Sequence, residues 1–341
     1  MNYIELSNGS KKILVRFRRF QPNDSDKLIR CIQDEYGESY FKRNFYNADY
    51  LKSEYSNGHI IFLVAERDNG DIVGMLALKR FLPRESMCEI ASEIFLKEYR
   101  GFKMAYPFFK YALRQIHLMK NVSAIYCLPV VFHDISQKLM ERIRLTPCGF
   151  VFGAFLMSKI RHSYKFDENL KHPQGIMIHR LGKKDAGVLY LPQEHQDIAS
   201  EIYNQLNVKF KFGESKTVAK KTIYTYDNDE VQENCAIYID IAGNDILEIV
   251  EEIQDSFQAQ NQTFNIFLNI SESGAIAAYE SLKQIGYFFA GFQPLCSERE
   301  IMVLHNPRKV PINMQTLTLT PRFRYICDYI EKFYKERCKN P

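Results

Sequence analysis

The stretch CEIASEIFLKEYRGFKMAYPFFKYAL, residues 88–113, most constrains what this chain can fold into. Its first nine residues alternate between apolar and polar side chains, which is typical of a half-buried strand. Apolar residues then recur at helical spacing from Ala105 onward. A short basic loop with Arg100 and Gly101 at its centre separates the two patterns. The segment therefore predicts a strand that runs through a basic loop into the beginning of a helix.

A loop of this kind predicts a binding site for a phosphate-bearing ligand. The first N–H groups of a helix have no intrahelical partner and carry partial positive charge, so they attract anions. Arg100 and Lys103 add two positive charges, and Gly101 allows a ligand to approach the backbone closely. The alternative interpretation is an ordinary strand-to-helix connection with solvated basic side chains.

Composition excludes several classes of protein. The formal net charge is only +4, and the basic residues are dispersed, which argues against a nucleic-acid partner. No apolar run reaches the roughly 18 residues of a membrane helix, and the first residues lack the apolar segment of a signal peptide. The 8 cysteines show no CxxC spacing, and the histidines show no metal-ligand spacing. We expect a cytoplasmic protein without disulfides, metal or membrane partner.

The order of periodic segments predicts an α/β fold with a mixed β-sheet flanked by helices. An Asn-Gly turn at residues 68–71 predicts that the two strands around it form a hairpin. Later strands alternate with helices, which favours parallel pairing. The predicted strands are 12–20, 59–65, 72–81, 88–96, 123–130 and 148–156, and the predicted helices are 25–36, 47–55, 105–120 and 133–144.

The second half of the chain repeats parts of the first. CGFVFGAFL at 148–156 resembles IGYFFAGFQ at 285–293, and residues 19–32 resemble residues 189–202 in the same order. Self-similarity on this scale predicts a duplicated fold, although an unrelated second α/β domain is the alternative. We expect domains at 1–183 and 184–310, with a helical tail at 311–341.

The basic loop, EYRGFKMA at residues 98–105, resembles the acetyl-CoA loop of the GNAT N-acetyltransferase superfamily. That loop reads Arg/Gln-x-x-Gly-x-Gly/Ala; Arg100, Gly101 and Ala105 match, and Lys103 stands at the usual middle glycine. The resemblance covers roughly residues 12–160. It implies an acyl-CoA-dependent N-acyltransferase that uses acetyl-CoA as default donor and transfers the acyl group directly to the amine of a small molecule or peptide.

The same resemblance implies a set of acyl-CoA contacts. Backbone groups of Phe95 and Leu96 would hold the pantetheine arm and the oxyanion. His133 stands where the family has an Asn, and Met140 stands where the family has a Tyr that often serves as general acid. The remaining implied contacts are Arg100, Gly101, Phe102, Lys103, Met104 and Ala105.

Two carboxylates of the strand before the loop are candidates for a general base. Glu89 and Glu93 are four residues apart, which predicts a common face of the strand. A carboxylate that faces an apolar cleft has a raised pKa suited to proton abstraction. We expect Glu89 to matter more than Glu93. The alternative is that both lie on a solvated face and pair with Lys or Arg.

The second half lacks the basic loop. Its strand at 235–241 leads into residues 242–245 and an acidic helix at 246–257, which would repel phosphates. We expect a degenerate copy that shapes the substrate cleft or mediates assembly. A non-catalytic protein that binds or senses CoA or another ligand is the alternative function. An interaction protein that uses the basic helix at 321–339 is a third. We expect instead that this helix docks on the second domain through one apolar face, formed by Phe323, Ile326, Ile330 and Phe333.

Overall fold

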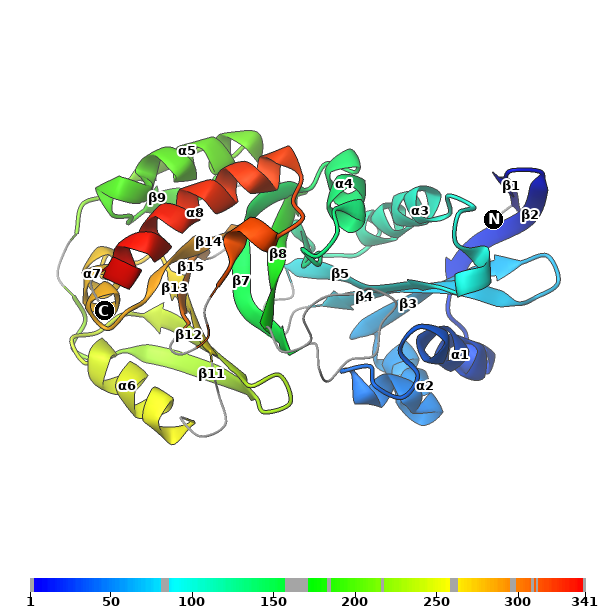
Figure 1. Cartoon of the computed structure of the whole chain (residues 1–341), viewed down its shortest axis with the longest axis horizontal. Helices are drawn as coiled ribbons and strands as arrows, with labels where there is room; N and C mark the ends of the chain where they lie inside the picture. Colours follow the sequence, from blue (N-terminus) through cyan, green and yellow to red (C-terminus); the bar gives the residue numbers. More distant parts are fainter. Residues whose placement is uncertain are drawn as a thin grey trace. The chain divides into compact units, whose positions relative to one another are not determined.

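The chain folds into two compact units of α/β structure. The computed structural model describes residues 3–80, 86–156, 171–182, 185–215, 218–257, 263–294, 299–307, 310 and 312–339. Within these residues, one unit extends to Cys127 and the other begins at Leu128. Each unit contains a mixed sheet with flanking helices, as the sequence predicts (Figure 1). The predicted domain boundary between residues 183 and 184 lies outside the described residues and stays a prediction.

The sheet of the first unit has the strand order β1-β2-β3-β4-β5-β6. Its neighbours are antiparallel except for β5 and β6, which are parallel. The hairpin predicted around the Asn-Gly turn is formed by β3 and β4. The elements are β1 (Ile4–Asn8), β2 (Lys11–Arg19), α1 (Ser25–Tyr36), α2 (Ala48–Asn57), β3 (Ile60–Arg67), β4 (Ile72–Arg80), β5 (Met87–Phe95), α3 (Ala105–His117) and β6 (Ala124–Cys127).

Helices cover both faces of this sheet. Figure 1 shows α1 and α2 on one face and α3 on the other. The apolar face of α3 buries Phe108, Phe109, Ala112 and Ile116, which are the residues that recur at helical spacing in the sequence. Burial of this apolar face, rather than helix propensity, supplies most of the stability of such a helix.

The sheet of the second unit has the strand order β8-β7-β14-β15-β13-β12-β11, and β9 and β10 form a separate parallel pair. In this sheet, β12 and β13 are parallel. The elements are α4 (Ile135–Arg142), β7 (Thr146–Leu156), β8 (Lys171–Arg180), β9 (Gly187–Leu189), α5 (Gln196–Gln205), β10 (Phe210–Phe212), β11 (Ile223–Asp229), β12 (Asn234–Ile241), α6 (Ile246–Ser256), β13 (Thr263–Asn269), α7 (Ala275–Gln284), β14 (Phe288–Pro294), β15 (Glu300–Asn306) and α8 (Pro321–Lys339).

The order of elements occurs twice along the chain. A parallel pair joined by a helix, β5-α3-β6, recurs as β12-α6-β13. A helix and an antiparallel hairpin then follow, first as α4-β7-β8 and again as α7-β14-β15. This recurrence supports the predicted duplication, with β7 and β14 as equivalent strands. The strand partner of Gly149 is Gly291, whereas Gly286 precedes β14.

The contact between β7 and β14 requires glycine on both strands. A Cβ atom added at Gly149 would lie 2.5 Å from the Cα of Gly291, and one at Gly291 would lie 2.3 Å from the Cα of Gly149. The two backbones therefore touch without side chains between them.

The C-terminal helix α8 packs on β14 and β7 of the second unit, as the sequence predicts. Its side chains Phe323, Ile326 and Ile330 are buried. The ring of Phe323 lies 5.4 Å from that of Phe150 in β7. The helix is thus part of the core of this unit, which leaves little of its apolar face for a partner.

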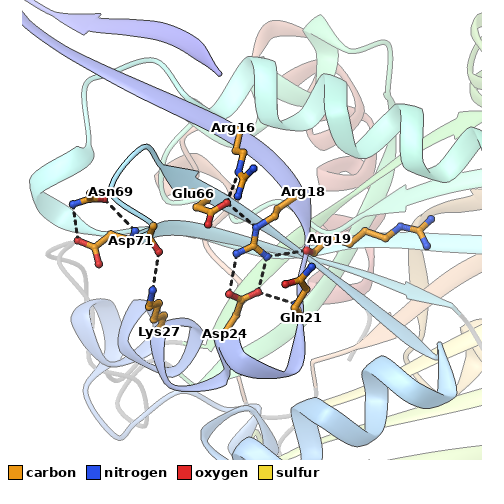
Figure 2. A network of polar contacts seen from close by, with 10 residues as sticks. Arg16, Arg18, Arg19, Gln21, Asp24, Lys27, Glu66, Asn69 and Asp71 are labelled. Carbon is orange, nitrogen blue, oxygen red and sulfur yellow. Dashed lines mark hydrogen bonds and ion pairs between the residues drawn. The ribbon is translucent and has the colours of Figure 1, made fainter. Parts of the chain in front are cut away.

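An ion-pair network joins β2, β3 and the turn before α1 (Figure 2). Arg18 binds both carboxylate oxygens of Asp24, at 2.6 and 2.9 Å, and donates from Nε to Glu66 at 2.8 Å. Arg16 binds the same carboxylate of Glu66 at 2.5 Å. Asp24 also accepts the backbone N–H of Gln21. Burial would raise the pKa of Glu66, but the two arginines outweigh it and lower the pKa from 4.5 to about 2.

The lowered pKa of Glu66 predicts a loss of stability in acid. Because the carboxylate is favoured in the folded state, its contribution is complete above pH 4.5 and disappears as the pH falls towards 2. Glu66→Gln should lower the free energy of unfolding at pH 7 by about 2–3 kcal/mol and flatten its decline below pH 4.5. Urea denaturation at several pH values measures both effects. Glu5→Gln, which breaks the exposed Lys12–Glu5 pair, should change stability by less than about 0.5 kcal/mol. Equal stability of Glu66→Gln and wild type at pH 7 would contradict this account.

Candidate active site

Strand β5 separates from its parallel neighbour part-way along its length. It pairs with β4 from Cys88 to Phe95, but among the described residues it pairs with β6 only from Met87 to Glu89. Strand β6 ends at Cys127, three residues before the end predicted from the sequence. In the described part of the chain, the edge of β5 that faces β6 therefore has no strand partner beyond Glu89. This opening lies directly before the basic loop.

Backbone groups at the end of β5 are divided between β4 and the opening. The N–H of Leu96 donates to the carbonyl of Val73 at 3.0 Å, so it is already used. Because N–H groups alternate along a strand, the N–H of Phe95 points away from β4 and towards the opening. The ring of Phe95 lies over Gly74, where an added Cβ would approach it to 2.3 Å. Of the two predicted backbone donors, Phe95 is therefore the one whose N–H is not bound to β4.

The basic loop keeps a glycine-like backbone although one glycine is replaced. Gly101 and Lys103 both have left-handed backbones, with φ of 91° and 57°. The side chains of Phe102 and Met104 are buried and anchor the loop, whereas Gly101 and Lys103 are exposed. Helix α3 then begins at Ala105 without a side-chain cap, so its first N–H groups face outward from the loop. The predicted strand-loop-helix geometry is present.

The two cations of the loop have different environments. Arg100 forms an ion pair with Glu35 at the end of α1, whose carboxylate side chain is only 9% exposed. The preceding residue of α1, Asp34, accepts the backbone N–H of Lys97 at 2.8 Å. Lys103 forms no ion pair within the described part of the chain. Arg100 therefore ties the loop to α1, and Lys103 is the cation that a ligand can reach without breaking a pair.

A β-bulge interrupts β5 between the two candidate carboxylates. Ala91 pairs with Ala77 and Ile94 with Met75, so two residues of β5 lie opposite one residue of β4. The extra residue is accommodated by Ser92, whose φ is 54°. The regular alternation of side chains does not continue through a bulge. The spacing of Glu89 and Glu93 therefore does not place them on a common face.

Glu89 and Glu93 have contrasting surroundings. Glu89 lies opposite Lys79 on β4. The carboxyl oxygen Oε1 of Glu93 is buried without a hydrogen-bond partner among the described residues. Burial raises the pKa of Glu93 from 4.5 to about 8. Of the two predicted carboxylates, Glu93 thus has the environment expected of a general base or acid near neutral pH.

His133 belongs to the second unit, just before α4. Its ring stands edge-on to Phe132, with 5.0 Å between the ring centres, and burial lowers its pKa. Met140, at the position of the family's tyrosine, is buried in α4. The acyl-CoA contact predicted for His133 stays a prediction.

Within its described residues, the second copy has neither an opening nor an accessible loop. Strands β12 and β13 pair continuously over six residue pairs, from Asn234 to Ile239 on β12. In the loop before α6, the N–H of Gly243 donates to Thr222 Oγ1 at 3.0 Å, and the N–H of Asn244 donates to the carbonyl of Ala219 at 2.9 Å. The chain's own residues 219–222 thus occupy the donors that would bind an anion. These contacts support the prediction of a degenerate copy.

Three side chains near the opening were missed by the sequence analysis. Tyr40 donates a hydrogen bond to the hydroxyl of Ser92 at 2.9 Å, and Lys42 donates to the same oxygen at 3.1 Å. Tyr40 and Lys42 lie in the irregular segment between α1 and α2, about fifty residues before their partner. No periodicity or motif marks them, because only the bulge of β5 brings the three side chains together.

The described residues contain no group of His, Cys, Asp and Glu side chains arranged to hold a metal ion. Among the same residues, no helix has both the length and the apolar character needed to cross a membrane.

No protein-family model and no curated protein matches the chain. Solved structures of N-acetyltransferases are similar to about half of it. A variant of the spermidine N-acetyltransferase of Vibrio cholerae is 15% identical over 50% of this chain and 95% of its own, with a TM-score of 0.40. An N-acetyltransferase of Staphylococcus aureus is 16% identical over 49% and 99%, with a TM-score of 0.39. The ribosomal-protein-S5-alanine acetyltransferase of Vibrio fischeri is 11% identical over 52% and 96%, with a TM-score of 0.38.

The left-handed backbone of Lys103 predicts that glycine is preferred there. A residue with a Cβ atom pays about 1–2 kcal/mol in this conformation, and glycine loses part of that advantage through its greater freedom when unfolded. Lys103→Gly should therefore raise the free energy of unfolding by about 0.5–1 kcal/mol. The same change at Lys110, inside α3, should lower it by about 1 kcal/mol. Chemical denaturation tests the opposite signs, and a loss of stability in both variants would show that the loop does not strain Lys103.

Proposed function

We propose that this chain is an acyl-CoA-dependent N-acyltransferase, with acetyl-CoA as the default donor. The observation that carries the proposal is the opening beside β5, followed at once by the loop of residues 97–104 and the uncapped start of α3. An extended thiol arm fits the unpaired edge of a strand, because it can hydrogen-bond to the free backbone groups. A pyrophosphate fits the helix start, because the N–H groups and Lys103 are positive.

Direct transfer then requires three things of the protein. The acceptor amine must lie against the thioester carbonyl, the oxyanion needs a donor, and the amine must lose a proton. We assign the oxyanion donor to the N–H of Phe95 and the proton acceptor to Glu93. The amine nitrogen bonds to the carbonyl carbon, the C–S bond breaks, and the CoA sulfur leaves as a thiolate that takes up a proton.

Charge reversal in the loop tests the donor site. Lys103→Glu replaces an unpaired cation by an anion, so it should weaken CoA binding by about tenfold or more, equivalent to about 1.4 kcal/mol. Isothermal titration calorimetry with CoA and acetyl-CoA measures the change. Lys110→Glu makes the same charge change at an exposed position further along α3 and should have a smaller effect.

Arg100 needs a paired variant because Glu35 would otherwise be left buried without its cation. The double variant Arg100→Gln/Glu35→Gln removes both charges of the ion pair at once. We expect weaker CoA binding from it than from wild type, since the loop loses the ion pair that ties it to α1. Wild-type affinity in both the Lys103→Glu and the double variant would reject the assignment of the loop.

The environment of Glu93 predicts the pH dependence of turnover. Because its raised pKa keeps the carboxyl protonated at neutral pH, kcat/KM should rise with pH and level off above about 8. Glu93→Gln should lower kcat/KM by about 10²–10⁴-fold and remove this ascending limb. Glu89→Gln should keep the limb, which reverses the expectation from sequence that Glu89 matters more. An unchanged profile in Glu93→Gln would show that proton removal occurs elsewhere.

A CoA-binding protein without transferase activity is the second candidate function. It is favoured by the ion pair that engages Arg100 and by Met140 at the position of the family's tyrosine. Such a protein would bind CoA and acetyl-CoA in calorimetry but release no thiol from acetyl-CoA in the presence of amines. Thiol release therefore separates the two functions.

A further inference from the structure

The bulge of β5 gathers a small polar cluster that the transfer reaction as proposed does not use. The hydroxyl of Ser92 accepts hydrogen bonds from Tyr40 at 2.9 Å and from the ammonium of Lys42 at 3.1 Å. The same ammonium lies 5.6 Å from the ring centre of Phe41 and 5.5 Å from that of Phe45. Lys42 is thus held in place by one hydroxyl and two aromatic faces.

Lys42 has no carboxylate in contact within the described residues, although an ammonium has three protons to donate. Burial lowers its pKa, although the residue keeps partial exposure. Glu89 attracts the ammonium and Lys79 repels it, both without direct contact. A partly buried cation with a hydroxyl as its hydrogen-bond partner is well placed to bind an anion from outside.

The cluster lies beside the opening where transfer is proposed. Ser92 is on the part of β5 that has separated from β6, and it lies three residues before Phe95, about 10 Å along the strand. Glu93, with its buried carboxyl group, is the next residue. A ligand at this position would meet the carboxyl group of Glu93, which can accept a proton from an amine. It would also meet Lys42, the partner of Ser92, which can bind an acidic group.

We propose that Lys42 binds the carboxylate of the acceptor, so that the acceptor is an amino acid or a similar small amine that carries a carboxylate. This inference rests on the proposed N-acyltransferase function and names its substrate class. The ammonium forms charge-assisted hydrogen bonds with a carboxylate, which are stronger than those with a neutral carboxamide. A polyamine brings only positive charge and is repelled by Lys42.

Turnover with matched acceptors tests the inference. The full chain is assayed by thiol release from acetyl-CoA with the common L-amino acids, their carboxamides and spermidine. We expect kcat/KM for the best acids to exceed that for their carboxamides by about tenfold or more. Lys42→Met should raise KM for the acids by about 10–100-fold with little change in kcat, and should raise KM for the carboxamides much less. Lys42→Arg should restore much of the preference.

Lys52→Met is the matched control, because Lys52 is an exposed lysine of α2 that pairs with Asp49 on the surface. It should keep the wild-type KM for acids. Equal kcat/KM for acids and carboxamides in wild type, or an unchanged KM in Lys42→Met, would overturn the inference.

Calorimetric titration of the same acids and carboxamides into the CoA-saturated protein gives a second reading that does not depend on turnover. Binding of acids that is lost in Lys42→Met, without any thiol release, would support the carboxylate site and reject the transferase function. Absence of acid binding in wild type would overturn the carboxylate site even if other amines are acylated.

Discussion

Strand β5 is paired along most of one edge but along only a short part of the other, and the candidate site depends on this difference in pairing. Its pairing with β4 continues to Phe95, whereas its pairing with β6 ends at Glu89. An unpaired strand edge is a liability unless something covers it, and a ligand that hydrogen-bonds to the backbone can do so. The bulge at Ser92 lies on this same stretch and increases the local twist of the strand.

The second copy shows that the topology alone does not make a site. Its parallel pair, β12 and β13, stays joined over six residue pairs, and residues 219–222 bind the N–H groups of the loop before α6. The same succession of strands and helices is therefore closed in one half and open in the other. The difference is a matter of hydrogen-bond partners: in the second copy the chain itself supplies them.

Much of the fold could be predicted because its signals are local. The alternation of β5, the helical spacing of α3 and the Asn-Gly turn between β3 and β4 each depend on residues close in sequence. Strand β1, with an almost fully exposed pattern, carries no such signal and was missed. The early end of β6 was missed for another reason: the apolar run continues beyond Cys127, but the pairing with β5 does not.

By itself, the sequence determined the strand-loop-helix unit, the repeated order of elements and the docking face of α8, because periodicity and glycine placement act within a few residues. Tertiary structure decided the chemistry of the site. It paired Arg100 with Glu35, 65 residues earlier, buried the carboxyl group of Glu93, and brought Lys42 to Ser92 across 50 residues. Ion pairing, burial and pKa depend on which distant segments come into contact. A bulge of one residue in β5 was enough to change which side chains of this strand meet Tyr40 and Lys42.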